Sequence, residues 1–312
     1  NENIKGPWIT SRPAALDAVK KIKGESFYRA RMGVHTGGAN GIYWIKIERA
    51  KGNDLIIENL AEIGKIKFKP YSSIVERKFI YPLLRGRETK EWYSQPSLHI
   101  ILPYDETTGS KAISEDSLEK KYNKTYQHLN NFRNELLNRS HYKQHFQLQK
   151  APFYSVYNTG QYTFAPYKVA WKYISSLLEC CVISTINDDV INEEKIIIPD
   201  TKLVFVGFDN LKEAHYFCAV LNSSLSKYVV KAYVVETQIA PQILDNISIP
   251  KFNPSNKVHS DLADLSIRCH KKVSADINVD DLEEQIDELA ANLLGLTKNE
   301  LKDIKDGLEE LR

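Results

Sequence analysis

The chain has 312 residues, of which 42% are hydrophobic and 26% are charged, as expected for one large globular domain or two smaller ones. It contains no apolar run of about 18 residues, so the sequence excludes a transmembrane helix, and we expect a cytoplasmic protein without a membrane partner. The first residues lack an initiating Met and the apolar core of a signal peptide, which suggests a segment from the middle of a longer polypeptide.

Charge is distributed unevenly along the chain. Residues 276 to 312 hold twelve Asp and Glu against four Lys and Arg, which leaves 38 basic and 28 acidic residues in the preceding 275. The net charge of +2 therefore conceals a basic body and an acidic C-terminal end. A basic body favours a nucleic-acid partner over a membrane surface, because no basic amphipathic helix with an aromatic face is present.

The first third of the chain predicts short elements. A helix is expected over residues 9–22, with Ser11 as its cap and Pro13 near the first turn. A glycine-rich loop from Gly33 to Gly41 leads into an alternating strand at residues 42–47. Residues 54–60 and 65–71 read as short strands or connections, and residues 99–105 as a short buried strand.

Residues 114–146 are helical in pattern, since apolar residues recur at three- and four-residue spacing. From Lys120 to Lys150 the chain carries seven Lys or Arg against one acid, Glu135, together with three histidines. This pattern is compatible with a solvated helix face or with a helix that faces phosphate.

The second half predicts strands at residues 180–186, 195–199, 203–208 and 246–252, and an amphipathic helix at 212–233. From Val258 the pattern is helical. Two final helices are expected to be separated at Gly295, with Thr297 as N-cap and Glu300 completing a capping box. Irregular alternation of strands and helices predicts an α+β fold with a helical end.

Motifs for catalysis are mostly missing. The sequence has no phosphate-binding loop, no H-E-x-x-H, no EF-hand, no paired Cys/His spacing and no G-x-S-x-G elbow. Asp189, Glu193 and Lys195 are similar to the acid–acid–lysine set of metal-dependent nucleases, but their spacing within one polar turn favours a solvated loop. Residues 252–255 share only Asn and one Pro with the N-P-P-aromatic loop of adenine methyltransferases, which indicates a turn. The cysteines lie in apolar segments and predict reduced core residues (Cys180, Cys181, Cys218 and Cys269).

Three basic and aromatic clusters are candidates for contact with a polyanion. The first surrounds the glycine loop and contains Arg29, Arg31, His35, Thr36 and Asn40, where a simple hairpin turn is the alternative. The second follows a hydrophobic anchor and contains Arg85, Arg87 and Lys90 beside Trp92 and Tyr93. Its alternative is a surface salt-bridge cluster with Glu88 and Glu91. The third contains Tyr162, Tyr167, Lys168, Trp171, Lys172 and Tyr173, where core packing of the aromatics is the alternative.

Five ordered motifs resemble one protein family. They are R-x-G-V-x-T-G-x-x-N at 31–40, I-Y-P-L-L-R-G-R at 80–87, A-P-Y-K-V-A-W-K at 165–172, L-N-S-S-L at 221–225 and I-D-x-L-A-x-x-L-L-G-L-T at 286–297. Together they resemble the C-terminal specificity region of Taq I-type and type IIG DNA adenine methyltransferases. In that family the region follows the catalytic domain and is called the target recognition domain.

The resemblance implies a mixed-sheet DNA target recognition domain with a helical insertion. Its first part would span residues 1–110, the basic helical segment 111–150, the second part 151–256 and the acidic C-terminal helices 257–312. It implies double-stranded DNA as a partner and DNA contacts from Arg31, His35, Thr36, Asn40, Arg85, Arg87, Lys90, Lys168 and Lys172. Which of these read bases and which contact phosphates is left open.

The resemblance also implies a restriction–modification parent that methylates adenine N6 after flipping the base, with or without a fused endonuclease. S-adenosylmethionine would bind in an upstream methyltransferase domain of the same polypeptide, and no cofactor, metal or catalytic residue is expected in this segment. Two alternatives remain: a stand-alone metal-dependent nuclease, and a protein-interaction domain that docks through its acidic tail. We expect that tail to pack on the body or on the catalytic domain, away from phosphate.

Overall fold

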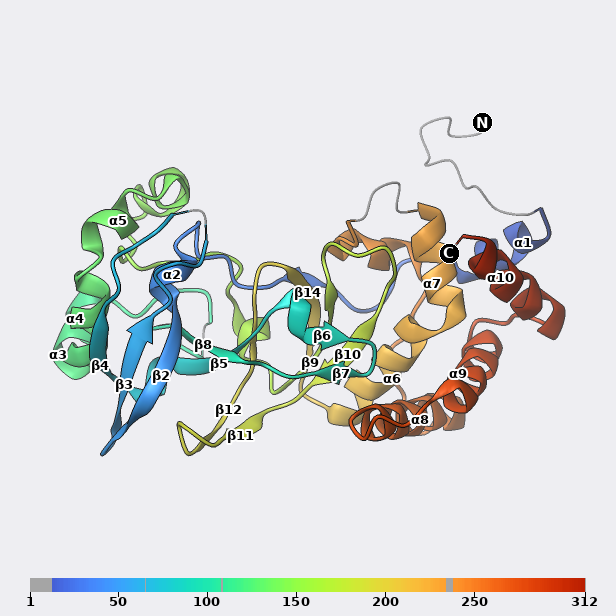
Figure 1. Cartoon of the computed structure of the whole chain (residues 1–312). Helices are drawn as coiled ribbons and strands as arrows, with labels where there is room; N and C mark the ends of the chain where they lie inside the picture. Colours follow the sequence, from blue (N-terminus) through green and yellow to red (C-terminus); the bar gives the residue numbers. More distant parts are fainter. Residues whose placement is uncertain (1–12, 65, 108, 234–237, 312) are drawn as a thin grey trace.

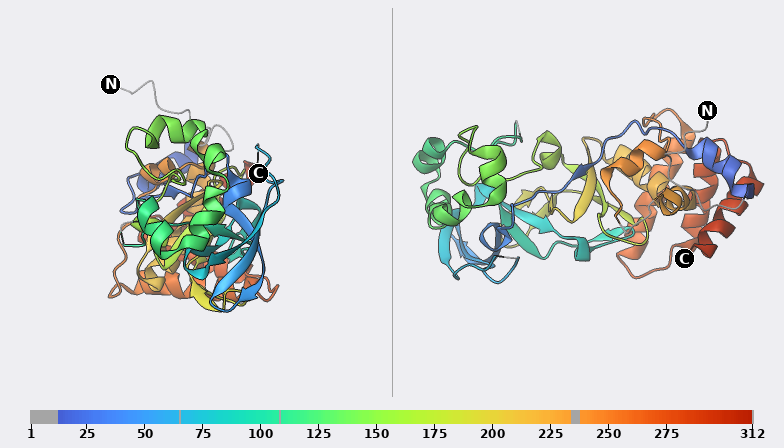
Figure 2. Two further views of the ribbon diagram at one scale, coloured as in Figure 1. Left: turned by 90° about the vertical axis from the view of Figure 1, so that its left-hand side faces the viewer. Right: turned by 90° about the horizontal axis from the view of Figure 1, so that it is seen from above.

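The computed structural model describes residues 13–64, 66–107, 109–233 and 238–311. These residues form an elongated molecule in which a sheet lobe and a helical lobe flank a central sheet (Figures 1 and 2). The predicted Ser11 cap lies outside the described residues. No described helix is long and apolar enough to cross a membrane.

The sheet lobe is built on six strands in the order β13-β5-β8-β2-β3-β4. Their bounds are Ile198–Pro199, Ile80–Leu84, Leu98–Ile101, Trp44–Lys51, Asp54–Asn59 and Ser72–Glu76. Neighbouring strands are antiparallel, except that β13 runs parallel to β5. The fully buried strand β5 explains the apolar run that precedes the Arg-Gly-Arg sequence.

Short helices cover this sheet: α2 (Asn40–Tyr43), α3 (Glu115–Lys121), α4 (Asn123–Asn130), α5 (Arg133–Leu137) and the π-helical turn η3 (Tyr142–Phe146). Leu118, Leu129 and Leu136 are buried in the same core as residues of β5 and β8. The helical pattern predicted for residues 114–146 is therefore confirmed, as a series of short helices. The apolar periodicity was real, but it is distributed over separate helical turns that follow the curved surface of the sheet.

The central sheet contains four antiparallel strands in the order β1-β14-β9-β10. They span Arg31–Met32, Leu203–Phe208, Tyr167–Lys172 and Cys180–Ile183. Two hairpins lie beside it, β6 (Thr89–Lys90) with β7 (Tyr93–Ser94) and β11 (Ile186–Asp188) with β12 (Glu193–Lys195). Short 3₁₀ turns complete the region: η1 (Arg77–Phe79), η2 (Gly86–Glu88) and η4 (Gln161–Phe164).

The helical lobe contains α1 (Pro13–Ile22), α6 (Leu211–Asn222), α7 (Ser224–Tyr233), the 3₁₀ turn η5 (Pro241–Asn246), α8 (Lys257–Val273), α9 (Asp280–Leu293) and α10 (Lys298–Glu310). The predicted arrangement of the last two helices is confirmed. Gly295 separates the last two helices at φ 70°, and Thr297 and Glu300 form the capping box. The acidic helices pack on the body, and all four cysteines are buried core thiols.

Several boundaries differ from the sequence predictions. The strand expected at 42–47 begins at Trp44, because Asn40–Tyr43 form a helical turn. Residues 246–252 and 66–71 form no strand. Ile247 and Ile249 are buried in the helical core, and the amide of Ser248 donates to the carbonyl of Ile22 at 2.8 Å. The helix predicted at 212–233 is two helices that meet at Ser223. The α+β class with mixed sheets is confirmed.

Candidate nucleic-acid interface

The glycine loop is held in one conformation by close packing. A Cβ on Gly33 would lie 2.0 Å from the carbonyl oxygen of Asp200, so only glycine fits at that position. Gly37 and Gly38 have φ angles of 70° and 90°, which side chains rarely adopt. The loop therefore depends on glycine for its shape as well as for a close approach of backbone to backbone.

Polar side chains of the loop are used within it. The hydroxyl of Thr36 donates to the side-chain oxygen of Asn40, and Thr36 itself is buried. Arg139 donates to the carbonyl oxygens of Thr36, Phe153 and Ser155 at 2.7–2.9 Å. Thr36 thus shapes the loop in this conformation, while Asn40 is partly exposed and its contact with DNA stays a prediction.

Arg139 is a structural residue that the sequence did not single out. It was one of the seven cations counted between Lys120 and Lys150, yet it is buried, and its guanidinium lies over the Tyr43 ring at 5.6 Å. A charge-assisted donor to carbonyls of two separate segments, at Thr36 and at Phe153 and Ser155, fixes the glycine loop to the helical insertion. No local pattern identifies such a residue, because the contact with the glycine loop joins residues 103 apart in sequence.

His35 lies in an aromatic cluster beside the loop. Its ring centroid is 4.8 Å from that of His141 and 6.1 Å from that of Tyr157, and its backbone pairs with the backbone of Tyr157. Burial lowers the pKa of His35, and the neighbouring His141, Lys202 and Arg139 lower it further by electrostatic repulsion. These effects favour the neutral imidazole in the free chain, and an approaching phosphate would favour its protonation.

The two arginines of the Arg-Gly-Arg sequence have different environments. Arg85 is only 7% exposed, and its guanidinium pairs with Glu88 and donates to Ser97 at 2.7 Å. Glu88 also accepts from the Arg85 amide at 2.9 Å, and Arg85 holds its pKa below the usual range although burial alone would raise it. The salt-bridge alternative therefore describes Arg85, whereas Arg87 is exposed.

The lysines predicted to bind DNA are also divided by burial. Lys168 is 1% exposed, its ammonium donates to the carbonyl of Ala165 at 2.6 Å, and burial lowers its pKa to about 7. Lys172 is partly exposed and pairs with Glu179 at 3.5 Å, while Lys90 is exposed on β6. In this conformation Lys168 offers no charge to a surface ligand. For Lys90 and Lys172, contact with DNA stays a prediction.

The turn at Asp200–Lys202 brings the glycine loop and the Arg-Gly-Arg sequence together. Gly33 packs on Asp200, the Asp200 amide donates to the carbonyl of Leu84 at 2.9 Å, and a Cβ on Gly86 would lie 3.7 Å from Cβ of Lys202. Burial raises the pKa of Asp200 to about 6, against the opposing effect of its hydrogen bond from Lys202. Lys202, which no sequence pattern singled out, is exposed and lies among these elements.

The resulting surface, which we call the central basic surface, combines exposed cations from three segments: Arg31, Arg87 and Lys202. Arg31 lies over the ring of Tyr162, with 5.4 Å between its guanidinium carbon and the ring centroid. The adjoining chain is unusually free of acids, because residues 136–178 contain no Asp or Glu. Such a surface can bind phosphates through its cations and can present aromatic faces to bases.

The residues of the nuclease alternative do not form a compact cluster. Lys195 is buried, pairs with Glu193 at 3.0 Å and donates to the carbonyl of Arg77 at 3.0 Å. Asp189 is exposed in the turn between β11 and β12, while the neighbouring Asp188 contacts His99 at 2.7 Å. No group of three His, Cys, Asp or Glu within the described ranges could hold a metal ion.

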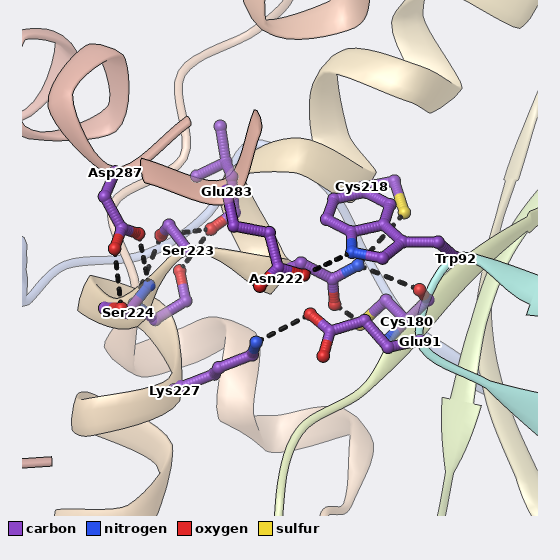
Figure 3. Close-up of polar contacts among 12 residues, drawn as sticks. Glu91, Trp92, Cys180, Cys218, Asn222, Ser223, Ser224, Lys227, Glu283 and Asp287 are labelled. Carbon is purple, nitrogen blue, oxygen red and sulfur yellow. Dashed lines mark hydrogen bonds and ion pairs between the residues drawn. The ribbon is translucent and has the colours of Figure 1, made fainter. Parts of the chain in front are cut away.

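A buried polar cluster joins the β6–β7 hairpin to the helical lobe, and we call it the hairpin–helix joint (Figure 3). Trp92 is buried with φ 60°, a strained backbone conformation, and its indole nitrogen donates to Glu283 of α9 at 2.7 Å. Next to it, Glu91 pairs with Lys227 of α7 at 2.6 Å. Trp92 was expected beside a bound polyanion, but it anchors the hairpin instead.

The L-N-S-S-L motif forms the other half of this joint. Asn222 exchanges two hydrogen bonds with the backbone of Cys180, at 2.8 and 2.9 Å, and so holds the edge of β10. Ser224 donates through its amide and its hydroxyl to Asp287, each at 2.7 Å (Figure 3). Two of the family-like motifs, at 221–225 and 286–297, therefore meet in space and serve assembly of the fold.

Comparisons with known proteins relate the chain to restriction–modification enzymes. No family model matches it. Over 181 residues, 58% of the chain and 33% of the relative, it is 28% identical to type II methyltransferase M.NspV of Nostoc sp. (strain ATCC 29411 / PCC 7524). Its fold is similar to part of the type IIL restriction-modification enzyme MmeI, whose structure was solved in complex with DNA. The TM-score is 0.51 at 9% identity, over 92% of this chain and 36% of that one.

The chain thus spans about a third of the length of each of these two proteins. Both likenesses support a fold related to restriction–modification enzymes, which agrees with the coarse expectation from the sequence motifs. The structural likeness extends across both lobes, since it covers nearly all of the chain. The division at residues 110, 150 and 256 stays a prediction, although strands from the first and second parts share both large sheets.

Proposed function

We propose that the chain is the sequence-reading, double-stranded DNA-binding module of a restriction–modification enzyme that methylates adenine N6. In this proposal the chain has no catalytic activity of its own. A methyltransferase domain of the same polypeptide, in the cytoplasm, binds S-adenosylmethionine and flips the target base, with or without a fused endonuclease. The chain's task is to bind the duplex and to select the sequence.

One observation carries the proposal: 92% of the chain is similar in fold to part of MmeI, an enzyme whose structure was solved with DNA. The likeness to M.NspV supports the same class of parent. The central basic surface adds a physical reason, because exposed cations near a chain segment without acids attract a polyanion.

The proposal is tested by titrating duplex DNA with the chain over a range of salt concentrations. Arg87→Ala and Lys202→Ala should each weaken binding and lower the slope of log K against log salt by about one if the side chain neutralises one phosphate. Lys302→Ala, at an exposed lysine of the acidic α10, is the matched control and should leave both quantities unchanged.

Failure of the wild-type chain to bind any duplex, or equal effects of all three substitutions, would contradict the proposal. Salt-insensitive binding to a protein partner through the acidic helices would favour the interaction-domain alternative instead. A metal-dependent cleavage of DNA by the chain alone would favour the nuclease alternative.

A further inference from the structure

A projecting turn at residues 143–150 has a composition that folding does not explain. Its sequence is Lys-Gln-His-Phe-Gln-Leu-Gln-Lys, and every residue except Phe146 is exposed. Leu148 is 90% exposed, the largest value among the large hydrophobic residues that the structure describes as exposed. Leucine side chains are normally buried in a hydrophobic core, whereas Leu148 is almost fully exposed to solvent. In Figures 1 and 2 the light-green helical turns after α5 project from one edge of the sheet lobe.

Hydrogen bonds make the turn a defined element. The amide of Gln147 donates to the carbonyl of Tyr142 at 3.0 Å, and the amide of Ala151 donates to the carbonyl of Phe146 at 3.1 Å. Each bond joins residues i and i−5, as in a π-helix. The Tyr142 hydroxyl donates to the carbonyl of Ala151 at 2.7 Å and closes the base of the turn. Lys150 adopts φ 50° to complete it. Such π-type turns are rare and occur often at functional sites.

The turn is continuous with the central basic surface. The rings of Phe146 and His145 lie 4.7 and 5.2 Å from the ring of Tyr157, whose backbone pairs with His35 of the glycine loop. No acid occurs between residues 136 and 178, and Glu115, which lines the same hollow as Lys150, is already paired with Arg133 at 2.8 Å. The electrostatic environment therefore favours an anionic partner over a protein with mixed charge.

We propose that this turn enters a groove of duplex DNA, where Leu148 packs against base pairs and Gln147 and Gln149 contact base edges. The inference rests on the function proposed above and assigns the reading element within it. A glutamine amide can donate to and accept from one adenine, and an apolar side chain complements a thymine methyl group. Lys143 and Lys150, at the two ends of the turn, are placed to contact flanking phosphates.

The test is selection from a pool of random-sequence duplexes by the wild-type chain, Leu148→Ala and Gln149→Ala, followed by affinity titrations on the enriched duplex. Ile277→Ala, at a 52% exposed isoleucine between α8 and α9, is the matched control. Leu148→Ala should bind the enriched duplex about tenfold more weakly with an unchanged salt slope, because an apolar contact releases no counterions. Gln149→Ala should lose preference at one base position.

Each outcome has a separate meaning. If the wild-type chain enriches a sequence and Leu148→Ala retains its full affinity and preference, the turn does not enter the groove, while the DNA-binding function stands. If the wild-type chain binds no duplex, both proposals fall. Thermal melting excludes a trivial cause, since truncation of a leucine this exposed should leave stability unchanged. A melting point lowered together with affinity would refute the description of Leu148 as a free contact residue.

Discussion

Removal of the Lys227 ammonium should destabilise the fold through the hairpin–helix joint. Lys227 and Glu91 lie 2.6 Å apart, with side chains only 11% and 22% exposed. Lys227→Met would leave the Glu91 carboxylate without its partner and close to Glu283. Breaking a buried ion pair in this way costs about 3–5 kcal/mol. Because Glu91 retains some solvent contact, we expect about 2–4 kcal/mol less free energy of unfolding.

The pH dependence of this loss follows from the pKa of Glu91. Burial raises that pKa to about 7, with the ammonium of Lys227 acting in the opposite direction, while an unfolded glutamate titrates near about 4.3. A raised folded pKa means that the protonated form is favoured in the folded state and that this advantage is lost as pH rises through about 7. In Lys227→Met, ionisation of the buried Glu91 carboxylate destabilises the folded state further, because its cationic partner is gone. The deficit should therefore be larger at about pH 8 than at about pH 5.5.

Urea denaturation followed by circular dichroism measures these free energies. Lys227→Met/Glu91→Gln should recover at least half of the loss, because it removes the unpaired charge. Lys231→Met is the control from the same helix, since Lys231 donates only to the carbonyl of Ser176 at 3.3 Å and should change stability by less than about 0.5 kcal/mol. A deficit that is independent of pH and unchanged in the double variant would refute burial of an uncompensated charge as its cause.

Four further outcomes are expected. Gly33→Ala should destabilise the chain by about 2 kcal/mol because its Cβ would meet the Asp200 carbonyl at 2.0 Å, whereas Gly86→Ala, with nothing closer than 3.7 Å, should be nearly neutral in thermal melts. Asp200→Asn should stabilise the chain by about 1–2 kcal/mol at about pH 7.5 and by almost nothing at about pH 4 in denaturant titrations. The reason is that the folded pKa of Asp200 is raised to about 6, so the wild type loses stability as pH rises through that value. DNA affinity should increase as pH falls below about 6.5, because phosphate near His35 would favour protonation of an imidazole whose pKa is lowered in the free chain. His35→Asn should reduce this increase. An identical pH profile in the variant would contradict a contact between His35 and phosphate. Calorimetric titration of the chain with S-adenosylmethionine should show no binding, and tight binding would show that the chain contains a cofactor site.

Local signals predicted local structure well. The capping box of Thr297 and Glu300 needs only residues three apart, and the structure contains it. Apolar runs likewise located β3, β10 and β14 because such strands are buried whatever their neighbours are. The helical pattern at 114–146 was found, but its division into short helices was not, because the periodicity of apolar residues does not reveal where a chain must turn to follow a sheet.

The candidate site was harder to predict, because charge in a sequence does not reveal burial. Arg85 and Lys168 were assigned to the DNA surface, yet both are enclosed by their own neighbourhood. Arg139 was one cation among many, although its carbonyl partners lie up to 103 residues away. Leu148 had no distinguishing feature in the sequence, and only its exposure in the fold makes it a candidate contact residue.

The interleaving of the two large sheets constrains how recombination could change the chain. Strand β13 pairs in parallel with β5, and β1 pairs with β14, so neither sheet is made from one continuous segment. A recombination event that exchanged residues 31–101 alone would place β5 and β1 beside β13 and β14 of a different parent sequence. The turn at 143–150 is different, since the hydrogen bond between Tyr142 and Ala151 closes its base. If the turn reads DNA as proposed, variation in that reading can accumulate in this short segment by point substitution, without disturbing either sheet.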